Sequence, residues 1–208
     1  MELNSRKTST YLFIGIGIAF LLIILMQFFS LRNPSPLIAR MEQQREMKNL
    51  QFKNGIDSPI PVAERSTFNG LRYYPVDERY VASAVLVLDS VRDTLTLMTT
   101  TGENLPLVRM GQLEFSLQGM KHRLTAYKYL EREREGQLFV PFRDLTSGVS
   151  TYGGGRYLDL AYTDDIKIDF NTAYNPYCVY NIEYSCPLPP SENKLMIEVR
   201  AGELNFGK

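Results

Sequence analysis

The sequence contains no tryptophan, one histidine, two cysteines and no excess of either charge. The single histidine, His122, excludes every site that requires two imidazole side chains. It lies between Lys121 and Arg123, whose positive charges disfavour cation binding, so we expect a surface or hydrogen-bonded histidine and not a catalytic one. The 23 basic side chains balance the 23 acidic ones, which removes the bulk positive charge typical of nucleic-acid binding. We therefore expect no nucleic-acid partner.

The two cysteines, Cys178 and Cys186, are separated by seven residues. This spacing matches neither a C-x-x-C redox motif nor paired zinc-knuckle ligands, so the sequence predicts no metal site. In an exported domain the pair would form a disulfide, which stabilises a short loop by about 2–3 kcal/mol, mostly through the unfolded state. In a cytoplasmic domain both would be buried thiols. The disulfide is a candidate, and both alternatives stay open.

One long apolar run is present, at residues 11–29 (YLFIGIGIAFLLIILMQFF), where Gln27 is the only strongly polar side chain. A helix of this length crosses the ~30 Å hydrocarbon core of a bilayer, so we predict a transmembrane helix after a tail of residues 1–10. The flanking basic residues favour a cytoplasmic carboxyl side. A short tail before a long apolar run is instead typical of an uncleaved signal anchor. We expect a single-pass membrane protein whose domain is extracytoplasmic (periplasmic).

Residues 30–52 are predicted to form a linker and a connector helix, because Ser35 and Pro36 suit the N-cap and the first helical position. Residues 53–208 are then one domain of about 150 residues, enough for a proper hydrophobic core.

From Leu71 onward apolar and polar residues alternate with a period of two, which is typical of β-strands. Nine short strands are predicted, at residues 80–88, 94–99, 105–110, 113–118, 123–130, 138–140, 156–161, 166–170 and 195–201. Turn signals lie at residues 101–104, 118–119 and 135–136, and the charges of ERERE (131–135) indicate a solvated hairpin end. Because the intervals are too short for crossover helices, we predict an all-β fold, mainly antiparallel, either a barrel or a sandwich.

The stretch from Leu138 to Asn193 holds both cysteines and the only Gly-Gly-Gly run. That run leads into a strand and lacks the Gly-Lys-Ser/Thr ending of a nucleotide-binding loop. Two interpretations remain. The glycines form a bulge or tight turn that needs positive φ, or their N–H groups form an anion-binding nest that Arg143 and Arg156 complete.

Two carboxylates face each other in one possible strand register. If residues 163–165 connect the strands at 156–161 and 166–170 as a hairpin, Leu160 lies opposite Ile168 and Asp159 lies opposite Asp169. Two carboxylates directly across a ladder repel each other. They must then be solvated, be bridged by a basic side chain such as Lys167, share a proton, or bind a cation.

Prolines stiffen the chain on both sides of the cysteines, which predicts a rigid loop packed across one end of the β domain. Its Asn and Tyr side chains either satisfy buried backbone groups or line a pocket. The candidate ligand-binding residues at this end are Arg143, Asp144, Thr146, Tyr152, Gly155, Arg156, Asp169, Asn171, Asn175, Tyr177 and Asn193.

Three segments, FVPFRDLTSGVSTYGGGRYLDL, DFNTAYNPYC and CPLPPSENKL, resemble the signature of the bacterial and archaeal family catalogued as domain of unknown function 1684. The resemblance covers roughly residues 40–203. It implies a shared fold and a shared motif, but no reaction, because the family is named for having no established activity. It also implies that the cysteine pair need not be a disulfide, since the family includes chains that look intracellular.

The leading hypothesis is a membrane-anchored β domain that binds a small polar or anionic ligand, or a partner protein, at one end. The alternative is a hydrolase-type or metal-assisted enzyme in which Asp144, Asp159 or Asp169 act as acid and base. A third possibility is a structural subunit of a membrane complex. One histidine and no cofactor motif leave little for catalysis, so the sequence favours binding, and it identifies no cofactor.

Overall fold

The computed structural model describes residues 14–27, 35–91, 93–131 and 134–207. The chain divides into two compact units, Met1–Arg40 and Met41–Lys208.

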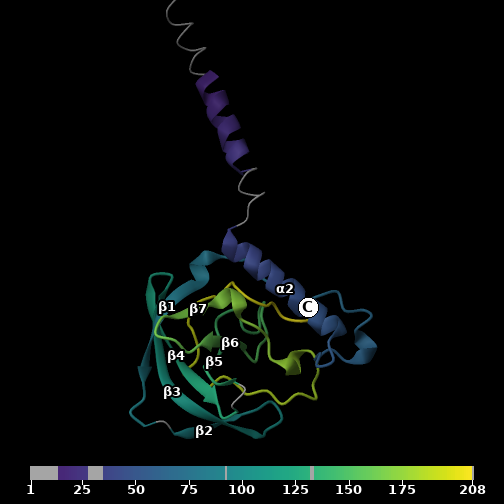
Figure 1. The fold of residues 1–208 in the computed structure, drawn as a ribbon, viewed down its shortest axis with the longest axis vertical. Helices are drawn as coiled ribbons and strands as arrows, with labels where there is room; N and C mark the ends of the chain where they lie inside the picture. Colours follow the sequence, from purple (N-terminus) through teal and green to yellow (C-terminus); the bar gives the residue numbers. More distant parts are fainter. Residues whose placement is uncertain (1–13, 28–34, 92, 132–133, 208) are drawn as a thin grey trace, which may run out of the picture. The chain divides into compact units, whose positions relative to one another are not determined.

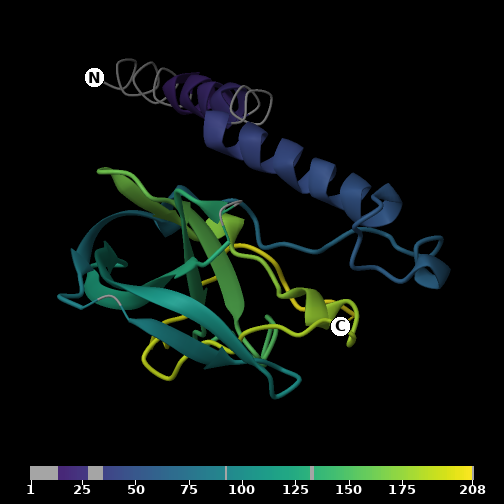
Figure 2. The ribbon, with the colours of Figure 1, turned by 60° about the horizontal axis from the view of Figure 1, so that its bottom comes forward.

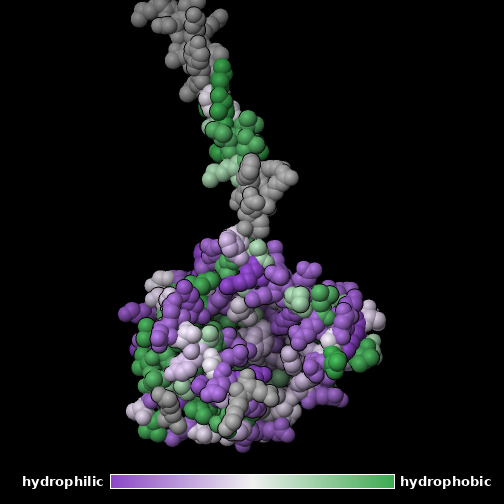
Figure 3. Space-filling model, in the orientation of Figure 1, coloured by the Kyte–Doolittle hydropathy of each residue, from purple (hydrophilic) through white to green (hydrophobic). Residues whose placement is uncertain are grey.

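In the first unit, residues 14–27 form a helix of almost entirely apolar residues (Figure 3). Within the described residues no helix is both long and apolar enough to cross a membrane. This finding contradicts the predicted transmembrane helix at residues 11–29, whose positions 11–13 and 28–29 lie outside the described residues. The single-pass, extracytoplasmic localisation and the role in a membrane complex lose their basis with it.

The predicted connector helix is present as α2 (Pro36–Asn54). The Oγ atom of Ser35 accepts a hydrogen bond from the N–H of Ile38 at 3.4 Å, as expected of an N-cap residue. Further along α2, Phe52 is buried, and its ring packs against those of Phe68 and Tyr180 at centroid distances of 6.4 and 5.1 Å. An aromatic cluster therefore holds the second half of α2 on its unit.

The second unit contains seven strands among the residues that the structure describes (Figure 1). They are β1 (Val81–Leu88), β2 (Thr94–Met98), β3 (Asn104–Leu117), β4 (Met120–Tyr129), β5 (Gln137–Phe142), β6 (Arg156–Ala161) and β7 (Ile166–Asp169). They form one sheet in the order β6-β5-β4-β3-β1-β7, with β2 paired to β3, and neighbouring strands are antiparallel. Short 3-10 helices include residues 62–64, 78–80, 170–172 and 177–179.

β6 and β7 lie at the two ends of this order, although they follow each other in the chain. The sheet curls so that these two ends approach, which gives a nearly closed barrel (Figure 2). Apolar side chains such as Leu113, Leu138, Leu158 and Ile168 fill its interior and are fully buried. Alternate residues of each strand supply this core, as the period of two requires. The predicted all-β, mainly antiparallel fold is confirmed in its barrel form.

Two strand predictions need correction. The segments 105–110 and 113–118 are one strand, β3, which a bulge between Arg109 and Gly111 interrupts. Residues 195–201 are not a strand. They alternate because Leu195, Ile197, Val199 and Ala201 are buried. The segment runs beside the loop after β5 and makes isolated hydrogen bonds to it, such as that from the Leu195 N–H to the Arg143 carbonyl at 2.8 Å, without forming a strand ladder.

The predicted hairpin of residues 156–161 and 166–170 is also wrong. β6 pairs with β5, where Asp159 lies opposite Phe139, and β7 pairs with β1, where Asp169 lies opposite Val81. The opening of the barrel lies between β6 and β7. Long-range pairing with β1 therefore replaces the local pairing that the short connection indicated.

Candidate functional site

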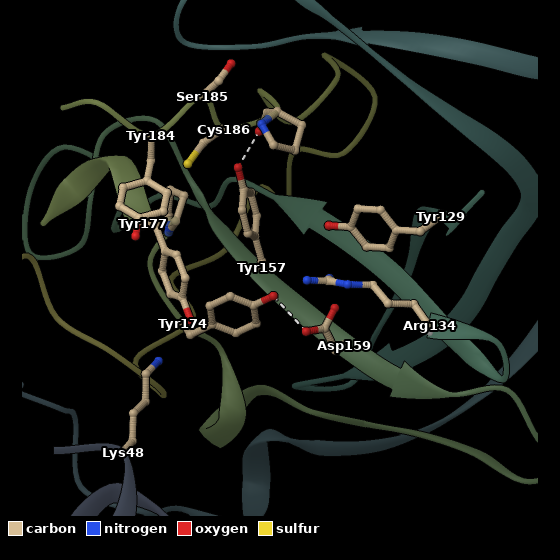
Figure 4. A pocket seen from close by; sticks show the side chains of 12 residues that line it. Lys48, Tyr129, Arg134, Tyr157, Asp159, Tyr174, Tyr177, Tyr184, Ser185 and Cys186 are labelled. Atoms are coloured by element: carbon tan, nitrogen blue, oxygen red, sulfur yellow. Dashed lines mark hydrogen bonds between the residues drawn. The ribbon is translucent and has the colours of Figure 1, made fainter. Parts of the chain in front are cut away.

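A pocket of about 370 Å³ lies beside β6 in the second unit (Figure 4). Its lining residues are Lys48, Tyr129, Arg134, Tyr157, Asp159, Tyr174, Pro176, Tyr177, Tyr184, Ser185, Cys186 and Pro187. Five of these twelve residues are tyrosines, and they come from β4, β6 and the loop that follows β7. The pocket is therefore assembled from segments far apart in the sequence.

The floor of the pocket follows from the alternation of β6. Leu158 and Leu160 point into the barrel, so Tyr157 and Asp159 share the opposite face. Tyr174 donates a hydrogen bond from its hydroxyl to Oδ2 of Asp159 at 2.7 Å, and its ring meets that of Tyr157 edge-on at 5.7 Å. The Tyr157 hydroxyl donates to the carbonyl of Pro187 at 2.5 Å. These contacts fix two rings and one carboxylate in the floor.

Two cationic side chains border the pocket, and they differ in whether a carboxylate neutralises them. The ammonium of Lys48 is paired with Glu203, at 2.5 Å between Nζ and Oε1. The guanidinium of Arg134 lies over the ring of Tyr129, 4.3 Å from its centroid, and points toward Tyr157 (Figure 4). Within the described part of the chain, no carboxylate lies within ion-pairing distance of Arg134. Arg134 therefore carries the positive charge of the pocket that the described side chains leave unpaired.

Burial keeps the tyrosines of the pocket protonated. Desolvation raises the pKa of Tyr157 and of Tyr129 above the ordinary value. Desolvation also raises the pKa of Tyr174 well above its ordinary value, and the neighbouring negative charge of Asp159 adds to the shift. Near neutral pH these hydroxyls are therefore hydrogen-bond donors and not anions.

The predicted residues Asp144 and Arg156 lie together, but in the interior. Their side chains are almost fully buried, and 3.4 Å separates Nη2 of Arg156 from Oδ2 of Asp144. The same guanidinium donates to the backbone carbonyls of Val199 and Ala201. Asp144 accepts from the hydroxyl of Thr146 at 2.8 Å and from the Val199 N–H at 2.7 Å. The pair joins the start of β6 to the C-terminal segment.

Three other predicted residues lie near this pair in the sequence. The Arg143 guanidinium donates to the carbonyl of Pro189 at 3.4 Å. Gly155 has φ +99°, and a Cβ atom there would lie 2.5 Å from the carbonyl oxygen of Phe142, so it fits the tight-turn interpretation of the glycine run. Tyr152 neighbours the cysteine pair, since burial and then Cys178 raise the pKa of its hydroxyl.

The predicted asparagines hold backbone segments together. Asn171 accepts from the Asp77 N–H and donates to the Asp77 carbonyl, both at 2.9 Å. Asn175 donates to the carbonyl of Leu204 at 2.8 Å, and its own N–H donates to the buried carboxylate of Glu203. Asn193 makes three such bonds, to β4 and β5. Of the eleven predicted ligand-binding residues, Tyr177 alone lines the tyrosine pocket.

The three candidate acid–base residues do not share a site. Asp159 faces the pocket, Asp144 is engaged by Arg156, and Asp169 accepts from the N–H of Asn171 at 3.0 Å. In the described ranges, no cluster of three or more His, Cys, Asp and Glu side chains is arranged to hold a metal ion. His122 lies 3.3 Å from the carbonyl of Leu117 and packs on Phe115, so the expected hydrogen-bonded histidine is confirmed.

Sequence reasoning missed most of the pocket. Arg134 belongs to the ERERE segment, which was predicted to be a solvated hairpin end, and Lys48 belongs to α2. The available signal was the alternation of β6, which places Tyr157 and Asp159 together on the face away from the core.

Comparison with known proteins identifies the family. The model of the family described as protein of unknown function (DUF1684) matches residues 66–204. The chain belongs to this family. The resemblance inferred from the three sequence segments is therefore confirmed, and the DUF1684 region includes every strand of the barrel and most of the pocket. No curated protein matches the chain.

A solved structure shares the fold. The solution NMR structure of an uncharacterized protein of Haloarcula marismortui is 35% identical, covers 82% of this chain and 95% of its own, and superimposes with a TM-score of 0.63.

Proposed function

We propose that this DUF1684 protein binds a small monoanionic ligand that carries a ring, in the tyrosine pocket. The size of the pocket supports this proposal, since about 370 Å³ lies within the roughly 300–1,000 Å³ range of small-molecule sites. The observation that carries the proposal is the combination of five tyrosines with the unpaired guanidinium of Arg134.

The aromatic lining favours a flat ligand. Tyr157 and Tyr174 meet edge to face, as do Tyr177 and Tyr184 at 5.3 Å, so the rings present both faces and edges to the pocket. A ring that enters between them gains apolar contact area and offset aromatic contacts worth about 0.5–1.5 kcal/mol per pair.

The charges favour a single negative group. Asp159 is satisfied by the hydroxyl of Tyr174 and Lys48 is neutralised by Glu203, whereas Arg134 has no carboxylate partner among the described residues. The Tyr129 hydroxyl points toward the pocket beside Arg134 (Figure 4). A ligand carboxylate placed there would accept two parallel N–H hydrogen bonds from the guanidinium of Arg134 and one O–H hydrogen bond from Tyr129.

Benzoate and benzamide test this proposal, because they share a shape and differ in charge. Isothermal titration calorimetry with the full chain is expected to show benzoate binding about tenfold more tightly than benzamide, since a charge-assisted hydrogen bond contributes about 1.5–3 kcal/mol. Arg134→Gln should abolish that preference.

The matched control is Arg200→Gln, which removes an exposed arginine paired with Glu198 and should leave both affinities unchanged. Equal affinity of the two probes, absence of binding by both, or a benzoate preference that survives Arg134→Gln would each contradict the proposal.

A further inference from the structure

Cys178 and Cys186 are both free thiols, and Cys186 lines the tyrosine pocket. Cys178 belongs to the 3-10 helix Tyr177–Val179, and its backbone N–H donates to the sulfur of Cys186 at 3.2 Å. The chain thus returns after seven residues to place the Cys186 sulfur against the backbone of Cys178.

The surroundings of the two thiols differ. Cys178 is partly exposed and Cys186 is buried. Thr100 holds Cys186 in place through two hydrogen bonds. The Cys186 N–H donates to Oγ1 of Thr100 at 3.2 Å, and the Cys186 carbonyl accepts from the Thr100 N–H at 2.9 Å. The neighbouring hydroxyls of Thr100 and Tyr152 act on Cys178 instead, because both lower the pKa of its thiol. The surroundings therefore favour the thiolate at the more accessible cysteine.

The pKa values of the two thiols shift in opposite directions. Cys186, together with Thr100 and Tyr152, outweighs burial and lowers the pKa of Cys178. Cys178 and burial raise the pKa of Cys186. A cysteine that only fills the core needs no such donors, whereas a nucleophilic thiolate is stabilised by them.

We propose that Cys178 and Cys186 form a peroxide-oxidisable dithiol site, in which Cys178 is the attacking thiol and Cys186 the resolving thiol. The Cys178 thiolate attacks a peroxide oxygen, which forms an S–O bond, breaks the O–O bond and releases hydroxide that is protonated to water. The sulfur of Cys186 then attacks the resulting sulfenic acid, which forms the S–S bond. The sulfenic oxygen leaves as water with the proton of Cys186. Two thiols are oxidised by two electrons and one peroxide is reduced to two waters.

The first experiment uses the reduced full chain and hydrogen peroxide. Intact-mass spectrometry is expected to show the loss of two hydrogen atoms per chain, and peptide mapping should place the new bond between Cys178 and Cys186. Early in the reaction of the wild-type chain, dimedone should label Cys178. Thiols that stay reduced, disulfides only between chains, or a sulfenic acid on Cys186 would each overturn the proposal.

Variants test the separate roles of the two thiols. Cys186→Ser should accumulate dimedone-reactive sulfenic acid on Cys178, because the resolving sulfur is gone, whereas Cys178→Ser should leave Cys186 at least tenfold less reactive. Tyr152→Phe keeps both sulfurs and removes one donor, so oxidation should slow severalfold. Equal oxidation rates of the two single-cysteine variants would contradict the assignment. The wild-type mapping decides the matter even where a variant fails to fold. Benzoate binding is not required for any of these outcomes, so the two proposals fail independently.

Discussion

Asn193 shows how one side-chain amide joins two strands that the sheet itself holds weakly. β4 and β5 are paired through the single register position Tyr127–Phe139. Close to that position, Asn193 accepts from the N–H of Thr125 at 2.7 Å and donates to the carbonyls of Thr125 and Pro141 at 2.9 and 2.8 Å. The amide therefore completes the ladder where the backbones diverge.

Replacement of Asn193 by alanine should lower the free energy of unfolding by at least about 3 kcal/mol. The variant leaves three buried backbone groups without a partner, and each such group costs about 1–3 kcal/mol. Urea denaturation measures the change. Asn104→Ala, at an exposed position of β3, is the matched control and should change the free energy by less than about 0.5 kcal/mol. A loss below 1 kcal/mol in Asn193→Ala would mean that water replaces the amide.

At the scale of elements, β3 is long because one glycine lets it bend. Gly111 has φ +144°, and a Cβ atom there would lie 2.1 Å from the carbonyl oxygen of Val87 on β1. The residue sits at the bulge where the register with β4 shifts. A bulge of this kind increases the local twist and helps the sheet to curl.

Gly111→Ala should therefore destabilise the barrel by more than about 2 kcal/mol, because the substitution adds a backbone clash to the strain of positive φ. Gly102→Ala is the control, since Gly102 also has positive φ but its Cβ would meet nothing within 4 Å; a loss of about 1 kcal/mol is expected there. Thermal unfolding followed by circular dichroism compares the two. Similar losses in both variants would show that the clash is relieved by a small backbone shift.

The strands β3, β6 and β7 show what the sequence could and could not predict. The period of two placed β6 at its observed bounds, and it implied one strand face for Tyr157 and Asp159. The bulge at Gly111 broke the period, so β3 was predicted as two strands. Pairing of β7 with β1 depends on residues far apart in the chain, which no local pattern encodes. Tyr177 was predicted to belong to the site, whereas Arg134 and Lys48 meet the pocket only through the tertiary fold.

At the scale of the whole molecule, buried charged side chains hold the C-terminal segment against the barrel. Arg156 donates to two backbone carbonyls of that segment and pairs with Asp144. Near its end, Glu203 accepts from Lys48 of α2, from the N–H of Asn175 and from the hydroxyl of Tyr180. Helix, loop and C-terminal segment thus converge on two buried ionic groups.

Arg156→Met should lower the free energy of unfolding by about 3–5 kcal/mol, because it leaves the carboxylate of Asp144 buried without its cation. Arg200→Met, which removes a mostly exposed side chain paired with Glu198, should cost less than about 1 kcal/mol. Chemical denaturation of both variants measures the difference. A loss in Arg156→Met no larger than in the control would show that the neighbouring hydroxyl and N–H donors alone stabilise Asp144.

The pairing of β1 with β7 also sets the order of events during synthesis. Val81 pairs with Asp169, 88 residues later in the chain (169 − 81 = 88). At ~5–20 residues per second, a ribosome needs on the order of 4–18 s to make that stretch. Until then the outer edge of β1 is an unpaired template for other strands. We therefore expect nascent chains of this protein to depend on chaperones until β7 has emerged, and the barrel to close only after translation of the last strand.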